Sequence, residues 1–302
     1  DELNEVTVAL AHFRPVLDPK VAEPALGQRG EHHRQPDRVY LLHLRPPPLQ
    51  QLWDEHPLHT NRHGLLAHQL QLRLPRQQLE QQQRQPAQSA AHGATVVLVG
   101  RTQSKLEEVY DAIEAAGHPQ PALCPLNLET ATEKDYEDLA DQLFDTFGKL
   151  DGLIHNAAEL GPRTLLDSVK PEAWMRVMQV NVNAPFVLTR AMMPLLRAAD
   201  DASVLLLSSS VGRKGRAYWG PYAVSKFAVE GMMQVLADEQ DGTSNIRVNS
   251  VNPGATRTPM RAKAYPNEQA EINPKPEEIM PVFLYLLGPD SKARNGEAFD
   301  AQ

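Results

Sequence analysis

From Gly93 onward, short apolar runs alternate with longer stretches in which apolar side chains recur every three or four residues. The runs have the length of a strand buried on both faces, and the periodic stretches have the length of an amphipathic helix. The pattern predicts strands over residues 93–100, 121–128, 150–155, 205–208, 246–251 and 296–300, and helices over residues 103–116, 132–147, 171–199, 222–239 and 276–287.

Local signals at the helix ends agree with this assignment. Thr132 with Asp135 three residues later predicts a capping box, and Gly117 and Gly148 are suited to end the helices before them. Pro185 and Pro194 lie inside the third periodic stretch, where a proline removes one helical hydrogen bond. We therefore expect a kink or a break there.

Strands that alternate with helices predict an α/β fold, a doubly wound parallel sheet with right-handed crossovers. Ligands of such sheets bind outside the carboxyl ends of the strands. Candidate polar residues and one turn follow the predicted strands at those ends, namely Arg101, Asn127, Asn156, Ser209 and Pro253-Gly254. The sequence therefore predicts a binding site at this edge.

Residues 1–91 have a different character. They contain most of the histidines, a Pro46–Pro48 run and a Gln-rich stretch, and their apolar positions follow neither a helical nor a strand period. Such composition buries too little apolar surface to offset the entropy of ordering, so we expect disorder. The histidines lack cysteines or carboxylates at ligand spacing, which disfavours a metal site.

Composition narrows the partners and the compartment. The formal net charge of -8 disfavours nucleic acid and anionic membranes as partners. No apolar run has the length of a membrane span, and the N-terminus lacks the basic and apolar segments of a signal peptide. The single cysteine, Cys124, fits a reducing compartment, so we expect a cytoplasmic protein.

The stretch from Leu205 to Glu239 carries the candidate chemistry. Tyr222 and Lys226 are four residues apart and share one helix face. A neighbouring ammonium favours the phenolate form and so makes the phenol a better proton donor and acceptor. A serine at the end of the preceding strand would complete a carbonyl-reducing site. Taken singly, each of these residues also fits a structural role, as a half-buried tyrosine, a solvated lysine or a strand-end serine.

Five motifs between His92 and Gln302 resemble the short-chain dehydrogenase/reductase family. In chain order these are His155-Asn-Ala-Ala158, Asn181-Val-Asn-Ala-Pro-Phe186, Ser208-Ser-Ser210, Tyr222-Ala-Val-Ser-Lys226 and Asn252-Pro-Gly254. A lone Tyr-x-x-x-Lys pair occurs by chance, whereas five motifs in family order and spacing are specific. The resemblance implies a Rossmann-like domain over residues 92–302.

The resemblance also implies a role for each matching residue. Tyr222 would be the catalytic acid/base, with Lys226 lowering its pKa and holding the nicotinamide ribose. Ser209 would bind the substrate oxygen, with Ser208 and Ser210 as competitors that family spacing disfavours. Asn181 would hold a water that relays protons. Asn127 would contact adenine, and Asn156 and Ala158 (where the family usually has glycine) would contact the adenosine ribose. Pro253 and Gly254 would contact the nicotinamide.

The choice of cofactor depends on Arg101. An acidic residue after the second family strand would bind the 2′-hydroxyl of NAD. Arg101 can instead pair with a 2′-phosphate, which favours NADP over NAD. The alternative is a surface arginine at a strand end.

The family's first strand and its glycine-rich phosphate loop have no counterpart in residues 68–83, which contain no glycine. The domain therefore looks N-terminally incomplete. The first methionine is Met175, and the family resemblance begins in mid-helix. Our hypothesis is that residues 1–91 are translated from a wrong reading frame; a single intact frame in resequenced DNA would refute it. The rival hypothesis is a genuine N-terminal interaction segment.

Three classes of function remain open. The first is an NADP-dependent oxidoreductase acting on a small carbonyl or alcohol substrate. The second is a catalytically silent relative that serves as a binding or scaffold protein, because its phosphate loop is missing. The third is an ordinary structural protein. By resemblance we expect a homodimer or homotetramer, paired through the helices that carry Asn181 and Tyr222, with Met232 and Met233 either there or in the core.

Overall fold

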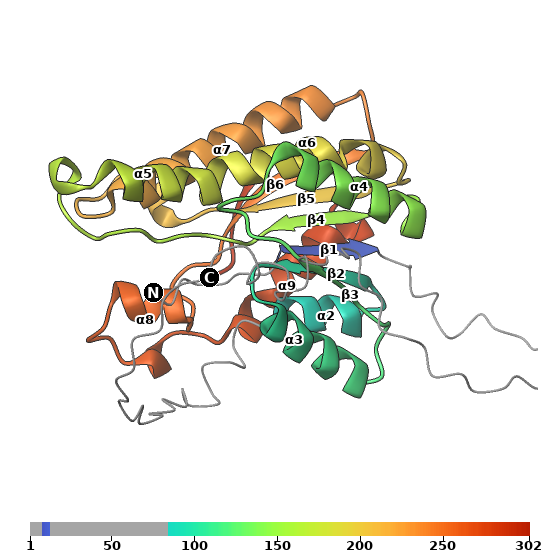
Figure 1. Cartoon of the computed structure of the whole chain (residues 1–302), viewed down its shortest axis with the longest axis horizontal. Helices are drawn as coiled ribbons and strands as arrows, with labels where there is room; N and C mark the ends of the chain where they lie inside the picture. The colour runs from blue at the N-terminus through green and yellow to red at the C-terminus, as the bar shows by residue number, and fades with distance from the viewer. Residues whose placement is uncertain (1–7, 13–83) are drawn as a thin grey trace, which may run out of the picture.

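The computed structural model describes residues 8–12 and 84–302 as one sheet with helices on both faces (Figure 1). Its strands are β1 (Val8–His12), β2 (Thr95–Gly100), β3 (Ala122–Pro125), β4 (Gly152–His155), β5 (Ala202–Leu207), β6 (Ile246–Asn252) and β7 (Ala298–Asp300). Its helices are α2 (Arg84–Ala91), α3 (Gln103–Ala115), α4 (Glu133–Phe147), α5 (Pro171–Met178), α6 (Ala184–Arg197), α7 (Gly220–Gln240), α8 (Pro259–Ala264) and α9 (Met280–Leu287).

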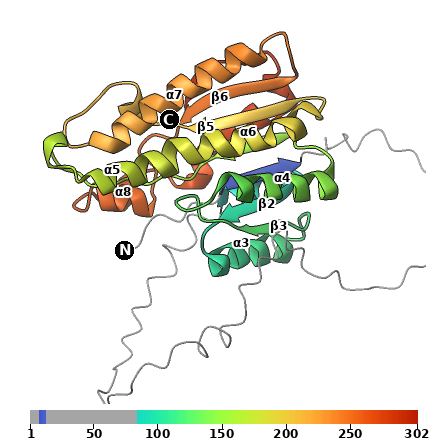
Figure 2. The same ribbon diagram turned by 45° about the horizontal axis from the view of Figure 1, so that its top comes forward.

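The sheet has the order β3-β2-β1-β4-β5-β6-β7. The pairs β2–β3, β4–β5, β5–β6 and β6–β7 are parallel, which confirms the predicted Rossmann-like α/β class. In Figures 1 and 2, helices α4 to α7 cover one face, and α2, α3 and α9 cover the other. The carboxyl ends of the parallel strands therefore meet at one edge, as expected.

Strand β1 departs from the predicted all-parallel sheet. It lies between β2 and β4 and is antiparallel to both, with Val8 opposite Val99 and His12 opposite Thr95. This segment falls within residues 1–91, for which we expected disorder, and the structure pairs it into the sheet. Without β1, β2 and β4 would each present an unpaired row of backbone groups, and a strand of either direction can satisfy them. The predictions for residues 13–83 lie outside the described residues.

Helix α2 lies within residues 1–91, whose composition differs from that of the rest of the chain, and it packs onto the domain. Ala90 is buried with Val96, Leu98 and Tyr110 in the apolar cluster between β2 and α3. The larger cluster lies between the sheet and the layer of α4, α6 and α7, and includes Met233. Met233 was expected either at a subunit interface or in the core. It is 1% exposed and therefore lies in the core.

The predicted helix ends are confirmed at α4. The Asp135 carboxylate accepts a hydrogen bond of 2.7 Å from the Thr132 backbone N–H, and Gly148 ends the helix with a φ of 70°. Such caps contribute about 1 kcal/mol each. The third predicted helix is irregular near Pro185, where a π-helical turn over Gln179–Asn183 joins α5 to α6 without ending the helix. Pro194 stays inside α6 without breaking it.

Candidate active site

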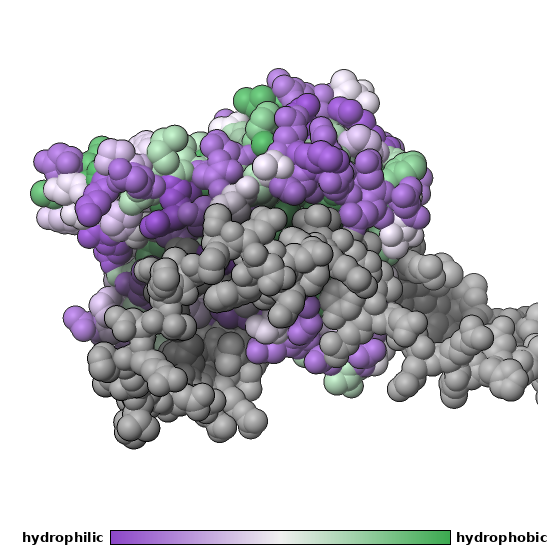
Figure 3. Space-filling model, in the orientation of Figure 1, coloured by the Kyte–Doolittle hydropathy of each residue, from purple (hydrophilic) through white to green (hydrophobic). Residues whose placement is uncertain are grey.

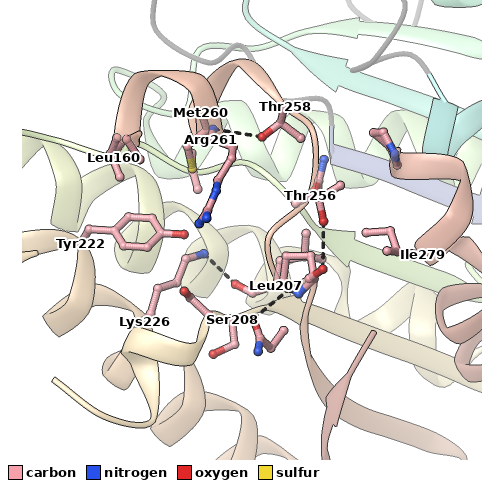
Figure 4. A pocket seen from close by; sticks show the side chains of 18 of the residues that line it. Leu160, Leu207, Ser208, Tyr222, Lys226, Thr256, Thr258, Met260, Arg261 and Ile279 are labelled. Carbon is pink, nitrogen blue, oxygen red and sulfur yellow. Dashed lines mark hydrogen bonds between the residues drawn. The ribbon is translucent and has the colours of Figure 1, made fainter. Parts of the chain in front are cut away.

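A pocket with a cavity volume of about 200 Å³ opens at the carboxyl edge of the sheet (Figure 4). It is lined by the strand ends of β4, β5 and β6, the first turns of α7, and the segment that contains α8. Seven of the residues singled out from the sequence line this pocket, namely Asn156, Ala158, Ser209, Tyr222, Lys226, Pro253 and Gly254.

Tyr222 lies in the first turn of α7, where Pro221 fits because the first helical N–H groups need no partner. Its side chain is buried against Trp219, with ring centroids 5.9 Å apart. Burial raises the pKa of Tyr222 to about 12, and a hydrogen bond with Ser209 opposes this rise. The phenol is therefore protonated at neutral pH and can donate a proton.

Lys226 lies one turn further along α7 and is 3% exposed. Its ammonium donates a hydrogen bond of 2.6 Å to the main-chain oxygen of Leu207 (Figure 4). Burial lowers its pKa to about 8, while the Glu230 carboxylate opposes this shift. Burial has the largest effect on the pKa of both groups, and Nζ lies 5.6 Å from the Tyr222 ring centre. The lowering of the Tyr222 pKa by Lys226 stays a prediction.

Gly212 allows the serine loop to approach α7 closely. A Cβ at this position would lie 2.8 Å from Cβ of Lys226, which is closer than real side chains come. The loop follows β5 and carries the candidate serines. Glycine at this position therefore lets Ser209 and Lys226 share one pocket.

Two serines of this loop face the pocket. Ser209 caps the short helix Ser210–Gly212, where its Oγ accepts a hydrogen bond of 3.4 Å from the Val211 N–H. The Ser208 hydroxyl is buried and has no hydrogen-bond partner in the part of the chain that the structure describes. An unpartnered buried hydroxyl at a pocket wall leaves a hydrogen bond for a ligand. Ser210 does not line the pocket.

Asn181 is buried behind the pocket, in the π-helical turn. Its amide Nδ2 donates to the Glu159 main-chain oxygen and to Oγ of Ser225, both at 2.9 Å. Its Oδ1 accepts from the Glu159 N–H at 2.7 Å. Both amide hydrogens are thus used in tying the β4 loop to α7, and the proton relay implied by the resemblance stays a prediction.

The Pro253-Gly254 turn follows β6 and carries the loop over the pocket. Gly254 has a φ of 70°, a conformation that glycine adopts without strain. Gln302 donates a hydrogen bond of 2.6 Å to the Pro253 carbonyl, so the segment after β7 braces the turn.

Arg101 and Asn127 follow β2 and β3 and do not line this pocket. The Asn127 side chain accepts a hydrogen bond of 3.1 Å from the Glu129 N–H, which stabilises its own turn. Both residues lie on the carboxyl side of the strands, as the sequence predicts. A cation at the end of β2 and an unpartnered hydroxyl in the pocket are features that fit a phosphorylated dinucleotide along this edge.

Sequence reasoning missed the part of the pocket supplied by the α8 segment and by Trp219. Thr256, Thr258, Met260 and Arg261 line the pocket, and the Thr258 hydroxyl caps α8 by accepting from the Arg261 N–H at 3.2 Å. The sequence signal was confined to Thr258-Pro259, a helix start. Where a short helix folds back over a sheet is decided by contacts distant in the chain.

Other kinds of site find no support in residues 8–12 and 84–302. They contain no group of three or more His, Cys, Asp or Glu side chains placed to hold a metal ion. No helix within these ranges has the length and apolarity to cross a membrane.

Comparison with known proteins agrees with the motifs. The profile of a family described as short chain dehydrogenase matches residues 87–269. The uncharacterized oxidoreductase YciK of Escherichia coli K12 is 48% identical over 213 residues, which cover 70% of this chain and 84% of the relative.

Solved structures show the same fold. A short chain dehydrogenase from Salmonella enterica is 45% identical with a TM-score of 0.72, over 76% of this chain and 99% of that one. A protein from Escherichia coli CFT073, crystallised as a complex with NADPH, is 48% identical with a TM-score of 0.71, over 72% of this chain and 90% of that one.

Proposed function

Since the chain belongs to the short chain dehydrogenase family, we propose that it is an NADP-dependent oxidoreductase that interconverts a carbonyl and an alcohol. The observation that carries this proposal is the convergence of Ser209, Tyr222 and Lys226 in one pocket. A proton donor, a second hydroxyl and a cation around one cavity suit the reduction of a carbonyl.

Each side chain has a defined task in the proposed reaction. Ser209 donates a hydrogen bond to the substrate oxygen and holds it beside the Tyr222 hydroxyl. In reduction, Tyr222 gives its proton to that oxygen; in oxidation, it takes the proton back. The ammonium of Lys226 stabilises the phenolate that remains. When bound, NADPH supplies the hydride that the protein itself lacks.

We assign the cofactor edge residue by residue. Arg101 would pair with the 2′-phosphate that distinguishes NADP from NAD. The structural relative that binds NADPH supports this choice of cofactor. On the adenosine side, Asn127 would contact adenine, and Asn156 and Ala158 would contact the ribose. On the nicotinamide side, Lys226 would contact the ribose, and Pro253 and Gly254 would contact the ring. Asn181 would relay protons.

Titration with NADPH, followed by tryptophan fluorescence, tests the proposal, because Trp219 lines the pocket. We expect saturable quenching and NADPH-dependent reduction of an aldehyde. Arg101→Asp should weaken NADPH binding and leave NADH binding unchanged. If NADPH causes no quenching at high concentration, the chain is a silent relative that serves as a binding protein.

We further propose a homodimer or homotetramer formed through α5, α6 and α7. Hydrophobic patches interrupt the hydrophilic surface of the helical layer α4 to α7 (Figure 3). Large apolar side chains are exposed on the three helices, namely Met175, Phe186, Val224, Phe227 and Val235. Exposed apolar residues that gather in this way mark interaction surfaces. Light scattering of Phe227→Ser should show smaller particles than the parent chain.

The compartment proposed is the cytoplasm. Cys124 is buried, and burial raises the pKa of its thiol to about 12, so it stays a reduced and unreactive thiol. Fractionation of cells that express the chain, followed by immunoblotting, checks this; recovery in a membrane or secreted fraction would contradict it.

A further inference from the structure

Helix α8 presents an arginine to the pocket. In Figure 4 the Arg261 side chain extends from this helix into the cavity, on the side of Tyr222. Arg261 and Lys226 are cations that line the cavity, and no aspartate or glutamate is found among its described lining residues. The charged side chains of this wall are therefore both cations, and Glu268, which pairs with Arg261, lies outside the lining.

The Arg261 guanidinium is held in place before any ligand binds. Its Nε and Nη2 donate hydrogen bonds of 2.6 Å to the two carboxylate oxygens of Glu268. The guanidinium also lies 3.9 Å from the ring centre of Tyr265. Of the five N–H donors of an arginine, Glu268 takes two, so donors remain for a ligand.

Two more arginines contact Tyr265, and one of them also contacts Trp219, which lines the pocket. Arg163 stacks on Trp219 at 4.6 Å and on Tyr265 at 4.9 Å from the ring centres. Arg216 donates from Nη1 to the Tyr265 hydroxyl at 3.2 Å. Stacked arginines keep their charge and add positive potential near Trp219 and Tyr265.

Part of the pocket wall is apolar. Leu160, Met260, Ala264 and Ile279 line it together with the Trp219 ring. A substrate that fits would carry an apolar body between its reacting oxygen and any charged end. This apolar part of the lining favours a substrate with apolar surface over a small, fully hydrated sugar.

Resting on the proposed function, we propose that the substrate is a carbonyl or alcohol with an anionic group that binds to Arg261. The planar fork of a guanidinium matches both a carboxylate and a phosphoryl group. The carbonyl of the same molecule would lie at the hydroxyls of Ser209 and Tyr222. The rival role for Arg261 is contact with a cofactor phosphate.

Three aldehydes of one shape test the proposal: 4-formylbenzoate, its neutral methyl ester, and 4-formylphenyl phosphate. We expect kcat/KM for at least one anion to exceed that for the ester by about tenfold or more, the usual value of a charge-assisted hydrogen bond. Comparison of the carboxylate with the phosphate identifies the preferred group. Equal kcat/KM for all three would overturn the proposal.

Two variants of α8 locate the effect. Arg261→Met should remove the preference for the anion while the Kd of NADPH stays unchanged, and Arg261→Lys should keep part of it. Lys263→Met changes the same charge on an exposed position of the same helix that does not line the pocket, and should leave the preference intact. If Arg261→Met weakens NADPH binding and spares the preference, Arg261 serves the cofactor and the proposal is wrong.

A binding experiment distinguishes failure of this inference from failure of the proposed function. Calorimetry with 4-(hydroxymethyl)benzoate and its methyl ester, in the presence of NADP, needs no turnover. If no aldehyde is reduced but the acid binds better than the ester and Arg261→Met removes the difference, the anion site stands and the oxidoreductase function fails. If acid and ester bind alike and neither anionic aldehyde is preferred in turnover, the anion site is refuted.

Discussion

The Lys226 ammonium is bonded to the main-chain oxygen of Leu207, at a distance of 2.6 Å. This bond joins the first turns of α7 to the carboxyl end of β5, at the edge where the pocket opens. The carbonyl holds the ammonium in a position from which water is largely excluded, so that burial controls the protonation of both Lys226 and its neighbour Tyr222.

Replacement of Tyr222 by phenylalanine should leave the fold intact and abolish most turnover. The ring still fills its buried place, so the free energy of unfolding should fall by only about 0.5–1.5 kcal/mol, the value of one hydrogen bond. Loss of the proton donor should lower kcat by about 10²–10⁴-fold. Steady-state kinetics with NADPH measures kcat, and fluorescence quenching should show unchanged NADPH affinity. Near-normal kcat would remove Tyr222 from the mechanism.

Glu230 tunes Lys226 from one turn further along α7. Its buried carboxylate accepts hydrogen bonds from Arg213 and Ser250, and its charge raises the pKa of Lys226 against the effect of burial. In Glu230→Gln the pKa of Lys226 should fall below about 8. Because the mechanism uses the ammonium form, the alkaline limb of kcat/KM should move to lower pH.

A pH profile of kcat/KM distinguishes this tuning from general loss of structure. Glu239→Gln, an exposed change on the same helix, is the matched control and should leave the limb in place. If Glu230→Gln lowered kcat/KM equally at every pH, the role of Glu230 would be structural and would not involve the pKa of Lys226.

Buried His155 should make the domain sensitive to acid. Its ring nitrogen lies 2.7 Å from the Thr189 hydroxyl, and its pKa falls from 6.5 to about 3, mainly through burial and also through the charge of Lys226. Below pH 6.5 the unfolded chain takes up a proton that the folded chain refuses. The free energy of unfolding therefore falls as pH falls, by up to about 1.4 kcal/mol per pH unit.

The variant His155→Asn keeps a polar group beside Thr189 and cannot titrate. Urea unfolding at pH about 7 and about 5.5 should show the parent chain losing more stability than the variant, by about 1 kcal/mol. Parallel losses in the two proteins would show that His155 does not carry the effect.

Gly254→Ala should lower the free energy of unfolding more than the same change at Gly242 does. Both glycines have positive φ, 70° and 63°, where alanine is strained by about 1–2 kcal/mol. An added Cβ at Gly254 would lie 2.7 Å from the Gln302 amide, whereas Gly242 has no atom within 4 Å. Gln302 must then give up its bond to Pro253.

Thermal unfolding and NADPH titration of the two glycine variants measure the difference. Gly242→Ala reports the backbone strain alone and should keep full NADPH affinity. Equal effects of the two changes on stability and affinity would show that the contact with Gln302 has no role.

Much of the fold could be predicted because its signals are local. The Thr132 cap, the end of α4 at Gly148 and the apolar run of β5 each depend on a few neighbouring residues. The Tyr222–Lys226 pair could be placed on one face because helical spacing alone requires it. A kink or break was predicted near Pro185, whereas the structure has a π-helical turn that leaves the helix continuous.

The features that escaped prediction are set by contacts distant in the chain. Strand β1 occupies the place between β2 and β4 through backbone bonds, which a hydrophobic pattern does not encode. Arg261 lies in the pocket because Glu268 and Tyr265 hold it there. Arg213 joins the serine loop to Asp300 at 2.8 Å, although the two residues are 87 positions apart in the chain. No spacing rule reveals such pairs.

The π-helical turn at Gln179–Asn183 makes α5 and α6 a single helix with a phase slip. A turn of this kind holds one residue more than an α-helical turn, which rotates everything after it by about 100° relative to the continuation of α5. Asn181 faces inward and the apolar side of α6 faces the sheet within the same helix because of that one additional residue. Removal of a single residue here would rotate Leu188, Met192 and Leu196 out of the core. The number of residues in this turn therefore sets which side of α6 packs on the sheet.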